Sequence, residues 1–282
     1  MASTQLPDNT PHHVRSISLP SRSHPLSVRV EEGLHKLKAW ATSSLPQSAS
    51  PSEELLCVGL QALEEMYDCA EELLRQPHTQ RVLARHQDEK WAAGELDSSV
   101  RLLDICGTTR DSVSSIKEQA QGLESALRTR RGGDSTVETK THALVQSRKK
   151  AHKDASKCFK ALKQMEDRKH AHLFSAADEG LWLAVRALKD LREITVAIFR
   201  SILAFISVPT PVLAGKMRRW PSMRSIHGRI SGKEVDLEKV TREEQRRLQA
   251  LEMEMGSLET GLESMFRRLI QNRVSLLNIF SL

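Results

Sequence analysis

Seven apolar residues in the last fifty positions of the chain follow one another at alternating steps of three and four. They are Leu248, Leu251, Met255, Leu258, Leu262, Met265 and Leu269. This spacing places all of them on one face of an α-helix, as in a seam that packs against other helices. Similar apolar spacing recurs along most of the chain. The pattern therefore predicts an all-α fold built from long helices.

The composition favours helices over sheets. Aromatic residues make up only 4% of the 282 positions, charged residues make up 28%, and Tyr67 is the only tyrosine. Such a chain has little of the material that strands prefer, but it suits leucine-rich seams with solvated outer faces. We expect an elongated antiparallel bundle of five or six main helices, forming one domain over residues 26–282.

Apolar periodicity, capping residues and helix breakers divide this domain into segments. Ser52 followed by two glutamates is a helix-start signal, whereas Pro77 and Pro209 end the helices that precede them. We predict helices over residues 26–42, 52–76, 90–131, 137–168 and 175–208, a short one over 79–86, and a last one from 234 almost to the C-terminus. The ending, residues 269–280, is expected to dock into the core.

Two segments differ from the rest in composition. Residues 1–25 are basic and rich in Ser and Pro, and we expect them to be a disordered tail. Residues 209–233 contain many bases and no acid, and we expect a mobile loop.

Two further features concern the compartment of the protein. The first sixteen residues hold no apolar stretch of the secretory type, and the four cysteines are scattered. These features favour a cytoplasmic protein with reduced thiols, while organellar targeting stays open.

The tail contains a short motif for modification. Arg15 precedes Ser18 by three residues, a spacing that suits kinases of basic substrates, and Pro20 can turn the peptide away. Phosphorylation of Ser18 would add oxygens that an arginine-lined groove can clamp. The motif Arg15, Ser16, Ser18 and Pro20 resembles those read by phosphoserine-binding 14-3-3 adaptors. The alternative is an inert tail.

Two features suggest contact with an anionic surface. Residues 194–208 are the most apolar window but are too short to span a bilayer, which leaves a central bundle helix or an interfacial membrane helix. The following loop could attract lipid phosphates through Lys216, Arg218, Arg219, Arg224, Arg229 and Lys233. Its alternative is a solvated loop. Bases over residues 148–163 are interpreted as the solvated face of a helix, and nucleic acid is not an expected partner.

One polar motif interrupts the predicted helix over residues 90–131. Asp104 and Asp111 share a helical face with Arg110 beside it, and Gly107 lies between them. Two carboxylates can perform acid–base chemistry if they converge on a pocket. No second cluster completes such a site, so we favour a buried polar network that fixes helix register. We expect no catalytic residue, metal site or cofactor.

Three stretches in this order resemble a plant-specific family, the BYPASS-like proteins, whose biochemical function is unknown. They are His13–Pro25, Leu103–Asp111 and Phe266–Asn278. The resemblance implies a largely helical protein, and some relatives are linked to root and shoot development. It implies no catalytic residue.

These observations lead to three functional hypotheses. The first is a non-enzymatic adaptor or regulatory protein of plants with protein partners and a phosphorylatable tail. The second is a peripheral membrane protein that binds anionic lipid through the apolar window and the basic loop. An enzyme is the third, and a compact pocket that joins Asp104 or Asp111 to other titratable groups would favour it.

Overall fold

A computed structural model describes residues 25–45, 51–86, 90–129, 134–167, 179–207 and 234–281. Within these ranges the chain forms seven helices and no strand, which confirms the all-α prediction. They are α1 (Pro25–Ser44), α2 (Glu53–Leu74), α3 (Pro77–Arg85), α4 (Lys90–Thr129), α5 (Asp134–Asp167), α6 (Glu179–Ser207) and α7 (Glu234–Ile279). Residues 1–24 of the predicted tail and the predicted loop 209–233 lie outside the described residues.

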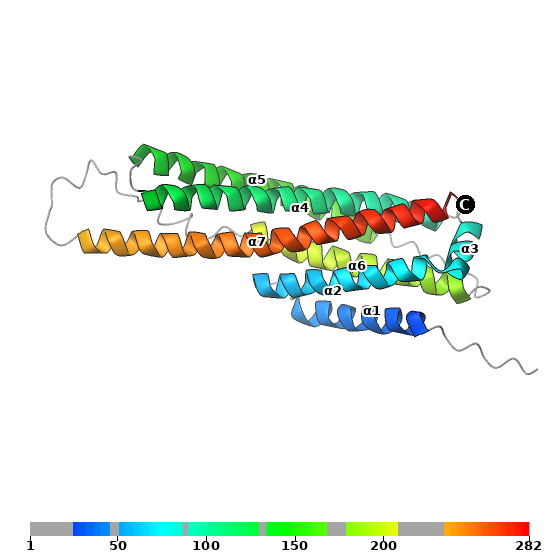
Figure 1. Cartoon of the computed structure of the whole chain (residues 1–282). Coiled ribbons are helices and arrows are strands. Elements are labelled where there is room, and N and C mark those ends of the chain that lie inside the picture. Colours follow the sequence, from blue (N-terminus) through cyan, green and yellow to red (C-terminus); the bar gives the residue numbers. More distant parts are fainter. Residues whose placement is uncertain are drawn as a thin grey trace, which may run out of the picture.

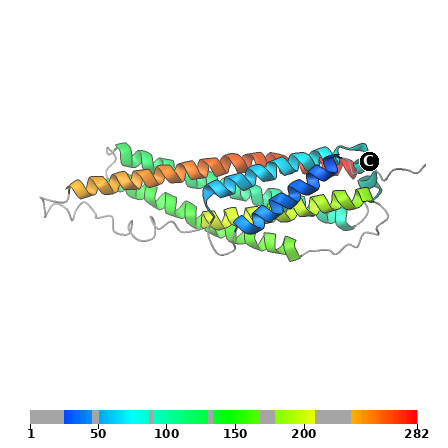
Figure 2. The same ribbon diagram turned by 90° about the horizontal axis from the view of Figure 1, so that it is seen from below.

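The helices pack side by side in an elongated bundle (Figure 1). Helices α4 and α7 are antiparallel, since Arg110 pairs with Glu263 and Gln121 bonds to Glu252. Seen from below, α1 lies over α2 and α6 (Figure 2). Some contacting pairs depart from the antiparallel expectation. Helix α2 runs parallel to α7, since Arg268 pairs with Glu64 and Ser275 bonds to Glu71, and α1 runs in the same direction as α6 (Figure 1).

The predicted seam of α7 is confirmed as a core element. All seven of its residues are at most 9% exposed, and α7 packs most extensively on α4 and next on α2. The seam continues past Leu269 in the same rhythm through Asn272, Leu276 and Ile279, which are all buried. It therefore extends to the C-terminal end of the helix, nearly three turns beyond Leu269.

The inward face of α4 does not follow apolar spacing alone in its first half. Val100 is apolar but 39% exposed, and the seam follows Ser99, Leu102, Cys106, Thr109, Val113, Ile116, Ala120, Leu123 and Leu127. Two hydroxyl residues occupy seam positions because each donates to a carbonyl of its own helix, Ser99 to Leu96 at 2.8 Å and Thr109 to Ile105 at 2.7 Å. A pattern that counts only apolar residues misses them.

Helix α6 is the central helix of the bundle. Phe199, Ile202 and Ile206 are at most 1% exposed, and α6 contacts α1, α2 and α5. Tyr67 and Thr195 share a buried hydrogen bond at 3.1 Å between α2 and α6. The structure thus supports the central-helix interpretation of the apolar window, because other helices of the bundle cover these side chains. None of the helices in the described ranges is long and apolar enough to span a bilayer.

Capping signals place the start of α2 as predicted. Ser52 accepts a hydrogen bond from the backbone N–H of Leu55 at 3.3 Å, and Glu53 and Glu54 occupy the first turn near the positive end of the helix dipole. Pro77 follows the end of α2 and is the first residue of α3, two residues earlier than predicted. Proline is favoured at a first helical position because the N–H that it lacks would have no partner there.

A second apolar cluster lies at the end of the bundle where α3 meets the C-terminal turns of α7. Its buried members are Leu74, Val82, Leu83, Trp91, Ala92, Ala184, Leu188, Leu276 and Ile279. Phe280 packs edge-on against the Trp91 ring, with centroids 5.6 Å apart. The ending of the chain is therefore docked against α3 and the first turn of α4.

Candidate functional site

The outer face of α7 carries three exposed apolar side chains near its C-terminal end. Ile270, Val274 and Leu277 keep 42%, 48% and 42% of their surface exposed. Steps of four and three residues place them on one face of the helix, beside the buried seam. We call these three residues the outer stripe.

A groove of about 560 Å³ borders the outer stripe where α7 meets α2 and α3. Ile270 and Val274 line the groove from α7, and Leu74 lines it from α2. The polar residues around them are Glu71, Arg75, Gln80, Arg267, Gln271, Ser275 and Asn278. An apolar centre with a polar and charged surround is typical of surfaces that bind other proteins.

Polar contacts hold α2 and α7 in register along this groove. Ser275 donates its hydroxyl to the Glu71 carboxylate at 2.7 Å, and Arg75 pairs with the same carboxylate at 3.0 Å. Arg268 pairs with Asp68 at 2.6 Å. Because Glu71 is only 8% exposed, these partners supply the compensation that a buried carboxylate needs. The groove is therefore formed by the folded chain itself before any partner arrives.

The prediction that the whole ending docks into the core is wrong for the outer stripe. Residues 269–280 contain two interleaved apolar stripes, and only the one that continues the seam is buried. Leu276 is fully buried, whereas Leu277 beside it is 42% exposed. The alternating three- and four-residue spacing, continued beyond Leu269, includes Leu276 but not Val274. Applied to the sequence, it would have distinguished the buried stripe from the exposed one.

The predicted polar motif on α4 is not a buried network. Asp104 and Asp111 are both exposed, because the buried face of α4 is formed by the residues between them and the two aspartates lie on its outer side. Arg110 is the member that fixes register. It pairs with Glu263 of α7 at 2.8 Å and lies over the Phe266 ring at 4.7 Å.

Gly107 plays a smaller part than expected. A Cβ at this position would lie 3.8 Å from the Phe266 ring, which is an ordinary van der Waals contact. Close approach instead requires a glycine at Gly261, where a Cβ would come within 2.8 Å of the Leu60 side chain. Equally close approaches occur between α1 and α2, where a Cβ at Gly33 or Gly59 would come within 2.6 Å of Met66 or 2.7 Å of Trp40.

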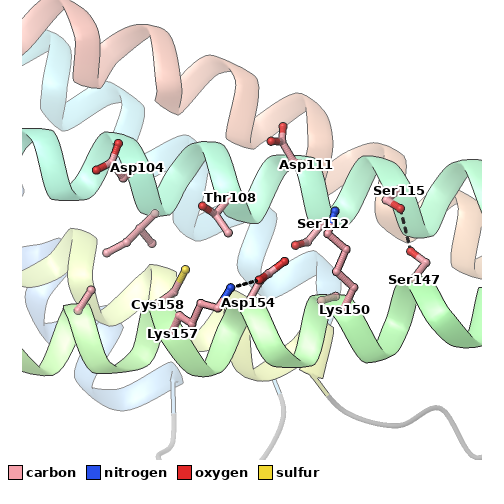
Figure 3. A pocket seen from close by; sticks show the side chains of 13 residues that line it. Asp104, Thr108, Asp111, Ser112, Ser115, Ser147, Lys150, Asp154, Lys157 and Cys158 are labelled. Carbon is pink, nitrogen blue, oxygen red and sulfur yellow. Dashed lines mark hydrogen bonds and ion pairs between the residues drawn. The ribbon is translucent and has the colours of Figure 1, made fainter.

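A second groove of about 420 Å³ lies between α4 and α5 and brings both aspartates near titratable groups of α5. Lys150, Asp154 and Lys157 line it from α5 (Figure 3). Figure 3 shows Asp104 and Asp111 on the side of α4 away from α5, while Asp154 accepts a hydrogen bond from Lys157 at 2.9 Å. The three carboxylates do not converge. Across the described ranges, no three His, Cys, Asp or Glu side chains form a metal-binding group.

The buried thiols near this groove are not activated as nucleophiles. Burial raises the pKa of Cys158 on α5, and burial raises the pKa of Cys106 on α4 to about 12. Cys57 on α2 also has its pKa raised to about 12, by burial and then by Glu53. These thiols therefore stay protonated at neutral pH, and a protonated thiol is a poor nucleophile.

Two predicted sites lie outside the described residues. The adaptor motif comprises Arg15, Ser16, Ser18 and Pro20, and the basic loop carries Lys216, Arg218, Arg219, Arg224, Arg229 and Lys233. Both stay predictions.

A family model described as Protein BPS1 matches residues 59–279. The match begins within α2 and reaches the last residue of α7, so it covers both grooves and the outer stripe. It includes Leu103–Asp111 and Phe266–Asn278, two of the three stretches that carry the resemblance. Neither the curated proteins nor the solved structures compared with the chain contain a match.

Proposed function

Because the chain belongs to the BPS1 family, which is a BYPASS-like plant family, we propose that it is a non-enzymatic helical adaptor or regulator. It acts by binding other proteins, in the cytoplasm, in the control of root and shoot development. The developmental role rests on the resemblance of the chain to this family.

The outer stripe is the observation that carries the adaptor proposal. Ile270, Val274 and Leu277 form a continuous apolar face, and a groove with charged groups adjoins it. An amphipathic helix can cover such a face with its own residues at i, i+3 or i+4, and i+7. Burying these side chains removes apolar surface from water, which is the main driving force of most protein association.

The chemistry of the α4–α5 groove supports the non-enzymatic part of the proposal. Its carboxylates point apart, and Asp154 is already paired with Lys157. Acid–base catalysis needs groups that meet within hydrogen-bond reach of one substrate. Protein binding needs only an accessible surface of suitable shape, which α7 provides.

The first test replaces Val274 with glutamate. We expect V274E to reduce capture of the protein partners from plant tissue by at least about tenfold, because a carboxylate cannot be buried in an apolar contact without a partner. Quantitative affinity capture of the full chain measures this. M253E is the matched control, since Met253 lies on the same helix and is 69% exposed but has no exposed apolar neighbour in the described part of α7.

Both variants are expected to melt within a few degrees of the unchanged protein, because both positions face solvent. Equal partner sets for V274E and the unchanged chain would contradict the proposed surface. Equal losses for V274E and M253E would assign the effect to added negative charge instead of to the outer stripe.

The second test concerns the tail. We propose that Ser18 is phosphorylated and that the phosphoserine, with Arg15 before it, recruits a 14-3-3-type adaptor. The full chain phosphorylated at Ser18 should bind such an adaptor, whereas the Ser18→Ala chain after the same kinase treatment should not. Ser16→Ala is the control and should bind. Identical partner sets with and without phosphate on Ser18 would contradict the switch and leave the α7 surface untouched.

A further inference from the structure

One face of α5 is lined with lysines. Six exposed lysines lie within less than half of the helix circumference over roughly 21 Å of its length. They are Lys149, Lys150, Lys153, Lys157, Lys160 and Lys163. We call them the α5 lysine face. From residue 139 to residue 165 the only acid on this helix is Asp154.

Most of this charge has no counter-charge in the fold. Lys157 pairs with Asp154 at 2.9 Å. Within the described part of the chain, the other five lysines make no ion pair. Several other cations of the bundle are paired across helices, as Lys117 is with Glu259 at 2.8 Å and Lys38 with Asp190 at 3.0 Å. The α5 lysine face therefore concentrates positive charge that the described part of the fold does not neutralise.

The position of α5 makes the lysine face accessible. Helix α5 lies at the edge of the bundle and packs mainly on α4 and α6 (Figure 1). Its buried residues Ala151, Ala155 and Leu162 face those helices, and the six lysines are exposed. Lys150 and Lys157 lie at the margin of the lysine face and also line the groove next to α4, whereas the other four lie away from it. The aspartates of α4, Asp104 and Asp111, lie across the groove of Figure 3 and not on the lysine face.

We propose that the α5 lysine face binds an anionic lipid surface and holds the long axis of the bundle along the membrane. Lysines near a membrane that contains acidic lipids are attracted by its negative surface potential, and the attraction sums over the charges that reach it. Long lysine side chains can bring their ammonium groups into one plane although their Cα atoms lie on a curved helix. No apolar side chain needs to enter the bilayer.

The chemistry of the face favours lipid over nucleic acid. All six cations are lysines, which act as point charges, whereas arginine supplies the bidentate contacts that are common in nucleic-acid recognition. The helix contains no Tyr or Trp, and its one phenylalanine, Phe159, is half-buried against the core, so none of these large rings is exposed to stack on a base. Lysine ammonium groups on an exposed helix can contact anionic headgroups in many arrangements, because the headgroups of a fluid bilayer can move to meet them.

The test measures binding of the full chain to vesicles of phosphatidylcholine with one quarter phosphatidylserine, by co-sedimentation. The α5 variant changes Lys149, Lys153, Lys160 and Lys163 to Gln. The matched control makes the same change at four exposed lysines on other helices, Lys36, Lys90, Lys189 and Lys239. A loop variant changes Arg218, Arg219, Arg224 and Arg229 to Gln. All three lower the net charge by the same amount.

We expect the α5 variant to lose vesicle affinity by on the order of 100-fold. The matched control and the loop variant should stay within about threefold of the unchanged chain. Replacing the four α5 lysines with arginine should preserve binding, and raising the salt well above physiological strength should weaken it. Vesicles of phosphatidylcholine alone should not bind.

Several results would overturn the proposal. One is an unchanged chain that does not bind the acidic vesicles. Another is an α5 variant that binds as well as the unchanged chain while the loop variant does not. Equal losses in the α5 variant and the matched control would reduce the effect to net charge. If a duplex RNA bound more tightly than the vesicles and depended on the same lysines, the ligand would be nucleic acid instead.

Discussion

A chain that ends at Gln271 is expected to unfold at a temperature lower by on the order of 10 °C than the full chain. The deletion removes Leu276 and Ile279, which are at most 2% exposed, and removes Phe280 from the Trp91 ring. Burying each large apolar side chain contributes roughly 1.5 to 3 kcal/mol, so the free energy of unfolding should fall by at least about 4 kcal/mol. Thermal and urea unfolding followed by circular dichroism measure both quantities.

Two neighbouring leucines provide the control for this prediction. Leu276→Ala should lower the free energy of unfolding by about 2 to 5 kcal/mol, because the side chain is fully buried and its removal leaves a cavity. Leu277→Ala should lower it by less than about 1 kcal/mol, since Leu277 is 42% exposed. If the shortened chain melts like the full chain, or if the two leucines have equal effects, the ending is not docked as described.

The second large effect is expected at the ion pair between Arg192 of α6 and Glu95 of α4. Both side chains are largely buried, with 23% and 12% of their surface exposed. Arg192→Met removes the cation and leaves the carboxylate in a site that water barely reaches. Removing one partner of such a pair lowers the free energy of unfolding by roughly 3 kcal/mol. Urea unfolding at neutral pH measures this loss.

This loss should depend on pH in a defined direction. Burial raises the pKa of Glu95 above its ordinary value of 4.5, and Arg192 opposes that rise. The folded protein therefore holds the proton more tightly than the unfolded chain, so protonation favours folding at low pH and this gain disappears as the pH rises through the folded pKa. Arg192→Met raises the pKa of Glu95 further. The destabilisation should be largest at neutral pH and smaller towards pH 4.5.

A double variant separates the charge from the packing. Changing Glu95 to Gln as well should restore much of the stability lost in Arg192→Met, because no buried charge then lacks a partner. The double variant should also lose the pH dependence. An Arg192→Met chain with the same loss at every pH, and with no recovery in the double variant, would assign the effect to lost arginine packing and not to an uncompensated carboxylate.

The helices were predictable from the sequence because their signals act over short distances. Ser52 caps α2 through a residue three positions away, and Pro77 separates α2 from α3 because it cannot continue the hydrogen-bond ladder. The seam of α7 was predictable for the same reason, since residues three and four apart meet on one face of any helix. The family was recognisable from three short stretches.

The prediction failed where a neighbouring helix decided the outcome. Ser99 and Thr109 lie in the seam of α4 although they are polar, and Val100 is exposed although it is apolar. Asp104 and Asp111 have the spacing of a pair, but α7 contacts Arg110 and leaves the aspartates outside. The candidate interaction surface was missed because Ile270 and Val274 are as apolar as the residues that the core covers.

By itself, the sequence determined a set of long helices with apolar seams and their approximate ends, because spacing, caps and breakers act within a few residues of one another. Only the tertiary structure decided that Leu276 is covered and Leu277 is not, and that α5, whose lysines the sequence already assigned to a solvated face, lies at the edge of the bundle. Burial depends on which helices pack against a face. That choice rests on the fit of whole helices to one another, which no local pattern contains.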